Sequence, residues 1–191
     1  MKLASHNSWS YLKPLKWWMK LLRFTARCQD VDIQTQYSKY GVRCFDLRIK
    51  FNKGKIQVVH NHIVYDITLV ELLDSLAWLN KKKNVAVRIL LDVRSKKQYT
   101  PEQCSLFNDF CKSIEEKYKN IKFWEGRNLY DWKVEYEFSY CPTVKGAYSS
   151  VCSPRLIDDW WPRLYAKINN KKVLQEDTDK DYLMIDFVNY C

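Results

Sequence analysis

The three histidines of this chain stand in two short polar motifs that could carry acid–base chemistry. His6 lies in the sequence SHNS (residues 5–8), and His60 opens the sequence HNH, which ends with His62. A histidine titrates near neutral pH, so two imidazoles that converge on one substrate can act as base and acid without a metal ion. His60 directly follows the apolar stretch 56–59, at the strand end where α/β proteins place reactive groups. A satisfied or surface histidine is the better interpretation of any single one, whereas the pair favours function.

A charged pair in the stretch VRCFDLRIK (residues 42–50) offers further chemistry. In a strand, Phe45, Leu47 and Ile49 share one face, while Asp46 and Arg48 share the other. The apolar face must meet covering helices, so the charged pair points to the opposite side, which in a barrel is the interior or the mouth. A structural salt bridge is one interpretation. The other is that Arg48 binds a phosphate and that Asp46 orients it.

Two further aspartates and an arginine lie in or just after apolar strands. Asp92 and Arg94 follow the stretch VAVRILL (residues 85–91), and Asp186 lies inside YLMIDFV (residues 182–188). An aspartate within so apolar a strand needs a partner. A histidine is a natural one, because a buried carboxylate fixes the tautomer of an imidazole and stabilises its charged form.

Glycine content and charge restrict how the chain could handle a phosphate. Four glycines occur, too far apart for a glycine-rich loop, which excludes the Walker phosphate loop and the dinucleotide fingerprint. Side chains must therefore hold any phosphate. The net charge is +10, and residues 1–27 supply six of these charges without a single acid. This asymmetry indicates an anionic partner, either a lipid surface or nucleic acid, with a merely solubilising basic face as the alternative.

The segment LKPLKWWMKLLRF (residues 12–24) predicts a helix with a basic stripe. Lys13, Lys16 and Lys20 fall on the stripe, and Trp17 and Trp18 are among the apolar residues around the rest. Tryptophan beside cations suits a membrane interface, where the rings lie at headgroup depth and the cations meet anionic lipid. A helix packed into the core with one solvated stripe fits the pattern equally well. No apolar run reaches the length of a membrane span.

Cysteine usage bears on metals and on the cellular compartment. Seven cysteines occur without a C-x-x-C pair, and this spacing argues against a zinc site. An odd number makes a reduced, intracellular protein the simpler interpretation, with a disulfide between Cys141 and Cys152 left open. Residues 15–24 are interrupted by basic side chains and precede no cleavage pattern, which argues against a signal peptide. We expect a cytoplasmic protein with peripheral membrane contact rather than a secreted one.

Strand-like and helix-like patterns alternate along the chain. Hydrophobic periodicity predicts strands over residues 42–50, 56–60, 85–91, 121–124, 133–140 and 182–188, and helices over 68–79, 100–119 and 157–168. The sequence TLVE (residues 68–71) is a capping box, and Pro101 lies in the first turn of its helix. This alternation indicates a single α/β domain spanning residues 1–191, with a mainly parallel sheet. A (β/α)8 barrel usually needs ~200 residues or more, so one of this length would be compact.

Together these motifs resemble the catalytic X domain of phosphatidylinositol-specific phospholipase C. The resemblance covers nearly the whole chain, with residues 120–180 matched only loosely, and it agrees best with the small X-domain-only branch and the bacterial metal-independent enzymes. It implies a compact, distorted TIM (β/α)8-like barrel without its closing helix, and a phosphoryl transfer in two steps. The motifs in order are SHNS (5–8), QYSKYGVRCFDLR (36–48), VVHNH (58–62), ITL (67–69), residues 85–92 and IDFV (185–188).

The resemblance also implies roles by position. His6 would be the general base for the inositol 2-hydroxyl, with Asp186 as the carboxylate that orients it. Arg48, beside Asp46, would neutralise the phosphate, and His60 would protonate the departing diacylglycerol oxygen. The product would be a cyclic inositol phosphate, which the same groups can open with water.

The resemblance bears on metal dependence as well. Calcium-dependent members carry an acidic residue where Arg48 stands, so the guanidinium predicts a metal-independent enzyme without a cofactor. Asp92 keeps calcium as the alternative, because the calcium enzymes carry an acid near that point.

The remaining expectations concern the substrate and rival functions. We expect a monomer that acts on phospholipid at a membrane surface and binds no nucleic acid. A catalytically weak lipid-binding module and a cyclising phosphodiesterase acting on RNA are the alternatives, the latter because RNA offers a neighbouring 2′-hydroxyl and the chain is basic. Further substrate-binding candidates are Asn7, Asp92, Arg94, Tyr148, Trp160 and Arg163.

Overall fold

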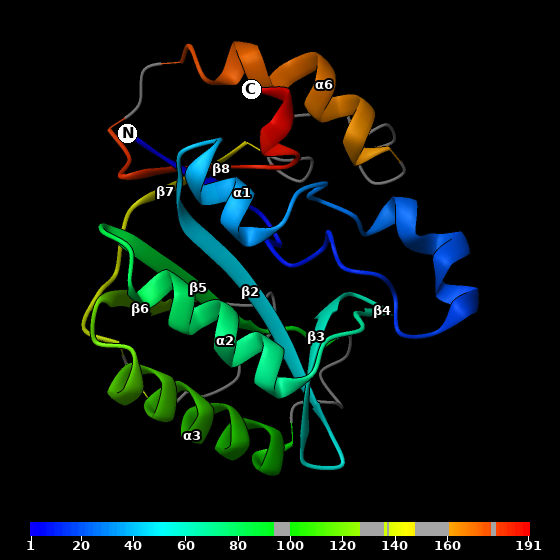
Figure 1. Ribbon diagram of the computed structural model, residues 1–191, viewed down its shortest axis with the longest axis vertical. Helices are drawn as coiled ribbons and strands as arrows, with labels where there is room; N and C mark the ends of the chain where they lie inside the picture. The colour runs from blue at the N-terminus through cyan, green and yellow to red at the C-terminus, as the bar shows by residue number, and fades with distance from the viewer. Residues whose placement is uncertain (94–99, 127–135, 137, 148–160, 177–178) are drawn as a thin grey trace.

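The computed structural model describes residues 1–93, 100–126, 136, 138–147, 161–176 and 179–191, which form a mixed α/β fold (Figure 1). The strands are β1 (Lys2–Ser5), β2 (Val42–Asn52), β3 (Lys55–His60), β4 (Ile63–Val64), β5 (Val85–Leu91), β6 (Ile121–Glu125), β7 (Val144–Ala147) and β8 (Tyr182–Ile185). The helices are α1 (Ile33–Ser38), α2 (Leu69–Asn80), α3 (Pro101–Lys117) and α6 (Pro162–Val173), with two 3-10 helices, η1 (Trp17–Thr25) and η3 (Val188–Tyr190).

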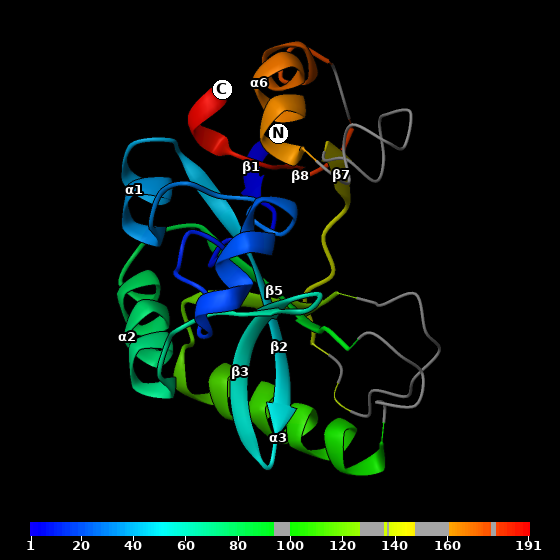
Figure 2. The same ribbon diagram turned by 90° about the vertical axis from the view of Figure 1, so that its right-hand side faces the viewer.

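Eight strands of the described residues form one mixed sheet. β1 pairs in parallel with both β2 and β8, β2 with β5, β5 with β6, and β7 with β8. The parallel strands therefore run in the order β7-β8-β1-β2-β5-β6, in which the first and last strands of the chain are neighbours. β3 and β4 extend the far end of the long strand β2 in antiparallel pairing (Figures 1 and 2).

One face of the sheet packs against the helices. Phe45, Leu47 and Ile49 of β2 are fully buried in the large core, as their alternation predicts. Leu76 of α2 and Phe107 of α3 belong to the same core, and the two helices lie side by side against the sheet (Figure 1). The core thus fixes the direction of every second side chain along β2.

The opposite face carries a smaller apolar cluster and then the titratable residues. The cluster includes Ala4, Cys44, Ala86 and Met184. The strand register joins them into one layer, because Ala4 pairs with both Cys44 and Met184, and Cys44 pairs with Ala86. Side chains two positions further along a strand share a face. These next positions hold Asp46 on β2 and Arg88 on β5, and they hold His6 and Asp186 directly after the ends of β1 and β8.

The helix starts agree with the sequence signals. The side chain of Thr68 accepts from the backbone N–H of Glu71, and the Glu71 carboxylate accepts from the Thr68 N–H, which confirms the capping box of α2. Thr100 caps α3, with Pro101 at its first position. No helix in the described ranges is long and apolar enough to cross a membrane.

The segment 12–24 differs from the predicted helix. It forms a 3-10 helix that begins only at Trp17, because the residues before it are tied to β4. Pro14 bridges to Tyr65, and the Leu15 N–H donates to the carbonyl of Val64. A chain held extended at Leu15 cannot start a helix at residue 12.

Three other boundaries also differ. The described part of 133–140 is not a strand. Its aromatic side chains pack on the core, with Phe138 stacked on Phe123. The strand that follows it in the chain is β7. Helix α6 spans Pro162–Val173 and so extends beyond the predicted end at residue 168. Residues 157–160 of the prediction lie outside the described part of the chain. Strand β8 ends at Ile185, so Asp186 follows the strand instead of lying within it.

Candidate active site

His6 lies directly after β1, and its two ring nitrogens have different partners. Nδ1 lies 2.7 Å from Oδ1 of Asp186, and Nε2 is contacted by a terminal guanidinium nitrogen of Arg48. Because a carboxylate only accepts and a guanidinium only donates, these partners assign the proton to Nδ1 and the lone pair to Nε2. In this arrangement the Nε2 atom of His6 is available as a base.

Asp46 lies beside the histidine between two arginines. The Nε of Arg48 and the backbone N–H of Asn7 donate to its Oδ2, both at 2.9 Å, and Arg88 Nη1 lies 3.5 Å from its Oδ1. Burial alone would raise the pKa of Asp46, but the charges of Arg48, Arg88 and His6 and the Asn7 N–H hold it well below its usual range. With Asp92 and Asp186, the cluster holds three carboxylates and two guanidinium groups.

Arg48 is held charged at the centre of the cluster. Burial opposes its charge, but Asp46 and Asp92 raise its pKa above the ordinary value. Its Nη1 lies 3.9 Å from Oδ2 of Asp92, which also accepts the Asn61 N–H at 3.1 Å. A guanidinium oriented by carboxylates on two sides is suited to bind a phosphate.

His60 faces His6 from the end of β3. The ring centroids are 5.6 Å apart and the rings are nearly perpendicular. Nδ1 donates to the carbonyl of Ala26 at 2.9 Å, which leaves the lone pair of His60 on Nε2. Burial first, and then the charges of Arg48 and His6, lower the pKa of His60 well below its usual value. An anion bound beside Arg48 would oppose these effects and favour the protonated, acidic form of His60.

His6, His60 and Asp186 are each followed by a residue whose backbone lies in the left-handed region of φ/ψ space. Asn7 follows His6 with φ 43°, Asn61 follows His60 with φ 53°, and Phe187 follows Asp186 with φ 47°. Asparagine tolerates this conformation, whereas for phenylalanine it is strained. The three strands thus turn sharply just after the residue that each brings into the cluster.

Two buried amides hold the turns in place. The Gln29 side chain donates to the carbonyls of His6 and Ile185, both at 3.1 Å, and accepts the Val188 N–H. Asn170 of α6 donates to the carbonyl of Asp186 at 2.8 Å. These bonds tie the end of β1 to the end of β8 and offset the strain at the turn after Asp186.

Replacing Asn61 should measure the strain of one of these turns. Asn61→Ala should lower the free energy of unfolding by about 1–2 kcal/mol, because a Cβ without a polar partner is disfavoured in the left-handed region. Asn61→Gly is the matched variant, and it should be nearly neutral. Urea unfolding at equilibrium measures both. Equal losses for the two substitutions would contradict the assigned strain.

The remaining substrate-binding candidates are distributed differently. Asn7 and Asp92 lie in the cluster, Asn7 through its backbone N–H. Arg163 is exposed on α6, where it pairs with Asp30 at 3.1 Å and donates to the Tyr190 hydroxyl at 2.7 Å. The other three candidates, Arg94, Tyr148 and Trp160, lie outside the described residues.

Three residues of the site were not predicted. Arg88 carried a signal, since it is the lone charge in the apolar stretch 85–91, but a strand pattern alone does not identify its partner. Gln29 and the buried Cys28 reach the cluster from the segment after η1. Nothing in their local sequence marks them, because their partners are distant in the chain.

The candidate membrane residues lie in and just before η1, between His6 and Cys28 in the chain. Trp17 is 75% and Trp18 43% exposed, and the side chains of Lys13, Lys16 and Lys20 are exposed as well. Only Met19 of η1 is buried. The segment is therefore not a core helix with a single solvated stripe, because its apolar side chains face outward.

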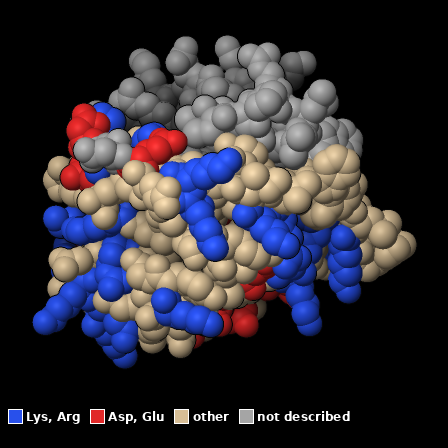
Figure 3. All heavy atoms as spheres, turned by 90° about the horizontal axis from the view of Figure 1, so that it is seen from above, with Lys and Arg blue, Asp and Glu red and all other residues tan. Residues whose placement is uncertain are grey.

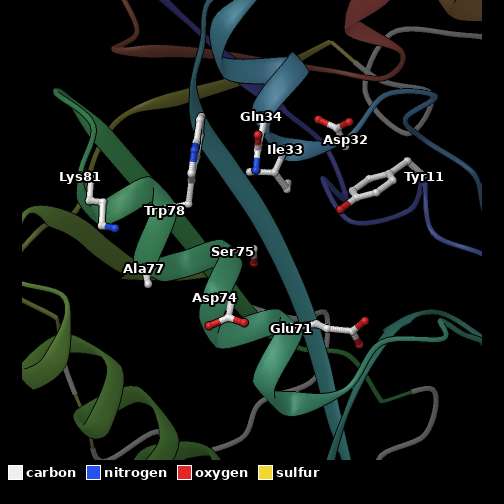
Figure 4. A pocket seen from close by; sticks show the side chains of 10 residues that line it. All are labelled: Tyr11, Asp32, Ile33, Gln34, Glu71, Asp74, Ser75, Ala77, Trp78 and Lys81. Atoms are coloured by element: carbon white, nitrogen blue, oxygen red, sulfur yellow. The ribbon is translucent and has the colours of Figure 1, made fainter.

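A hollow lies away from the histidines, between α1 and α2 (Figure 4). Its volume is about 660 Å³, and two of its three acidic side chains have structural roles, since Asp32 caps α1 and Glu71 completes the capping box of α2. None of the cluster residues lines it. The lining residues are Tyr11, Asp32, Ile33, Gln34, Glu71, Asp74, Ser75, Ala77, Trp78 and Lys81.

Comparison with known proteins adds no assignment. No protein-family model matches the chain, and no curated protein sequence matches it significantly.

Proposed function

We propose that this protein is a metal-independent phosphodiesterase that cleaves phosphatidylinositol-type phospholipids at a membrane surface, releasing diacylglycerol and a cyclic inositol phosphate. The observation that carries the proposal is the linked set Asp186–His6–Arg48–Asp46 with His60 opposite. It provides a base, an anion-binding cation and a second imidazole around one point. These three groups are sufficient to cleave a phosphodiester that has a hydroxyl next to the phosphate.

In the first step, Nε2 of His6 accepts the proton of the inositol 2-hydroxyl. The alkoxide oxygen attacks phosphorus and forms the P–O bond of the cyclic phosphate. Arg48 leaves Nε2 for the phosphate oxygens, where charge builds up, and the Asp186 carboxylate stabilises the imidazolium of His6. The bond from phosphorus to the glycerol oxygen breaks, and His60, protonated beside the bound phosphate, gives that oxygen its proton.

The second step runs the same groups in reverse. His60 takes a proton from water, the hydroxide opens the cyclic ester, and His6 returns its proton to the inositol oxygen. Both histidines then have their starting protonation states. One site can therefore carry out transfer and hydrolysis without a further residue.

The cluster does not suit calcium. Calcium takes six to eight oxygen ligands, whereas the Asp46 carboxylate here is bound by Arg48, Arg88 and the Asn7 N–H. Asp92 likewise accepts from Asn61 and lies near Arg48. The guanidinium of Arg48 provides the positive charge next to the phosphate.

Chelation tests this proposal. Purified protein should release water-soluble inositol phosphate from phosphatidylinositol vesicles at a rate that EDTA does not lower, to within about a factor of two, because no step uses a resident metal. Added Ca²⁺ after EDTA should give no activation. Loss of activity in EDTA that Ca²⁺ restores would contradict metal independence, and binding of vesicles without any product would favour the lipid-binding module.

The surface near the site supports action at a membrane. Exposed apolar side chains gather on η1 and on α6, which contact each other, and basic side chains flank them. Figure 3 shows Lys and Arg spread over the face seen from above, which includes α6. Such a combination binds anionic lipid. The exposed apolar residues are Leu15, Trp17, Trp18, Leu21, Leu22 and Phe24 around η1, and Trp161, Leu164 and Ile168 on α6.

The two tryptophans of η1 should contribute most of this membrane affinity. Trp17→Ala together with Trp18→Ala should weaken binding to vesicles that contain phosphatidylinositol by at least about tenfold, since two exposed indoles lose their interfacial burial. Vesicle sedimentation measures the change. Leu69→Ala with Val70→Ala removes exposed apolar groups from α2 and is the matched control. Equal losses in the two double variants would contradict a specific membrane face.

The strand order supports a barrel as the fold of the site. The order β7-β8-β1-β2-β5-β6 is that of an incomplete ring: it follows the chain order of the parallel strands cyclically, because β8 pairs with β1, and in the described residues the sheet is open between β6 and β7. Closing that ring between β6 and β7 would give the distorted TIM-like barrel that the resemblance implies. The site would then lie at the carboxyl ends of the strands, as in other barrels.

A further inference from the structure

Cys28 is a third metal-ligating group beside the two histidines. Its Sγ lies 3.7 Å from Nδ1 of His60, and the side chain is fully buried. Burial above all, and then the charge and a hydrogen bond of Asp186, raise the pKa of the thiol well above its usual value. The reaction described above assigns the thiol no step.

The three residues come close to the geometry of a zinc site. One ring nitrogen of His6, one of His60 and the Sγ of Cys28 all lie within 4.8 Å of one another. Tetrahedral zinc, with Zn–S near 2.3 Å and Zn–N near 2.0–2.1 Å, separates its ligand atoms by roughly 3.3–3.6 Å. With an upper limit of 4.8 Å the three groups come within reach of this spacing, and the side chains must close the remaining distance when the metal binds.

The surroundings of the rings also suit a soft divalent cation. Histidine ligands of zinc usually donate their other N–H to a carboxylate or a backbone carbonyl. His6 has Asp186 as such a partner, and His60 has the Ala26 carbonyl. Thiolate and imidazole select zinc over calcium or magnesium. Residues 6, 28 and 60 share no short motif, which is why spacing in the sequence argued against such a site.

We propose that His6, Cys28 and His60 form an inhibitory site for Zn²⁺. On binding, the guanidinium of Arg48 leaves Nε2 of His6 and the thiol of Cys28 releases its proton to solvent. The thiolate and one lone pair from each neutral imidazole then enter the coordination sphere. The metal then holds the lone pairs of His6 and His60, so neither imidazole can transfer a proton in the reaction. Inhibition rests on the proposed function, whereas metal binding does not.

Cobalt reports the binding directly, because a Co²⁺–thiolate bond has a charge-transfer absorption in the near ultraviolet. Titration of the full chain with Co²⁺ should give this band with one equivalent, and Zn²⁺ should remove it. Cys28→Ser should abolish the band and weaken Zn²⁺ binding in a competition assay by at least about tenfold. Cys44→Ser, a buried cysteine of β2 outside the three-residue group, should retain both.

Inhibition is measured separately, relative to the metal-free rate of each variant on phosphatidylinositol vesicles. Saturating Zn²⁺ should slow the wild-type chain by at least about tenfold and Cys28→Ser much less. Absence of the thiolate band in the wild-type chain would overturn the site, even if the serine variant fails to fold. A thiolate band in a chain without turnover would leave the site standing and refute the proposed function. Turnover together with an unchanged Zn²⁺ affinity in Cys28→Ser would refute the metal site and leave the proposed function standing.

Discussion

His6→Ala should lower kcat on phosphatidylinositol by roughly a thousandfold, the size expected for loss of a well-placed general base. The substitution removes the imidazole whose Nδ1 lies against the Asp186 carboxylate and whose Nε2 accepts from Arg48 before it takes the substrate proton. It leaves Arg48 and Asp46 paired, so substrate binding should change much less than kcat. Initial rates over a range of vesicle concentrations separate the two effects.

The third histidine provides the control for this substitution. His62 lies two residues after His60 but outside the group formed by His6, Cys28 and His60, so His62→Ala should keep most of the activity. A His6→Ala variant with a rate within tenfold of the wild-type rate would show that another group is the base. Circular dichroism and thermal unfolding should confirm that both variants are folded.

Arg48→Lys should lower kcat by roughly a hundredfold or more, the loss typical of removing one stabilising donor from a charged transition state. The lysine keeps a positive charge near Asp46 and so keeps the buried carboxylate compensated. It loses the planar fork that reaches Asp46, His6 and the phosphate from one group. The defect should therefore appear in kcat more than in stability.

Arg43→Lys is the matched substitution on the same strand. The Arg43 guanidinium bonds backbone carbonyls and lies over the Tyr37 ring, away from the histidines. Its replacement should leave kcat unchanged. If the two lysine variants show the same rate, charge alone suffices at residue 48 and the assigned geometry of Arg48 is wrong.

Much of the site could be predicted from strand periodicity. Alternation along residues 42–50 placed Asp46 and Arg48 opposite the core face, and the structure confirms that Phe45, Leu47 and Ile49 are core residues. Parallel strands bring their carboxyl ends to one edge, which is why residues as distant as His6 and Asp186 meet. The apolar sequence around Asp186 correctly indicated that it needs a partner.

Other features depend on contacts that local sequence does not encode. Segment 12–24 lost its first helical turn to the bridge between Pro14 and Tyr65. The sharp turn at Phe187 ended β8 one residue before Asp186, and buried bonds from Gln29 and Asn170 hold it there. Such bonds join residues more than a hundred positions apart, or different elements, and periodicity carries no information on them.

The most direct measurement is a time course of phosphatidylinositol cleavage followed by ³¹P NMR. A five-membered cyclic phosphodiester should accumulate first, and the inositol monophosphate should follow more slowly, because the neighbouring hydroxyl attacks before water does. Monophosphate formed from the start without the cyclic ester would contradict the roles of His6 and His60. Cleavage of RNA to 2′,3′-cyclic ends with no product from any phospholipid would contradict the substrate class.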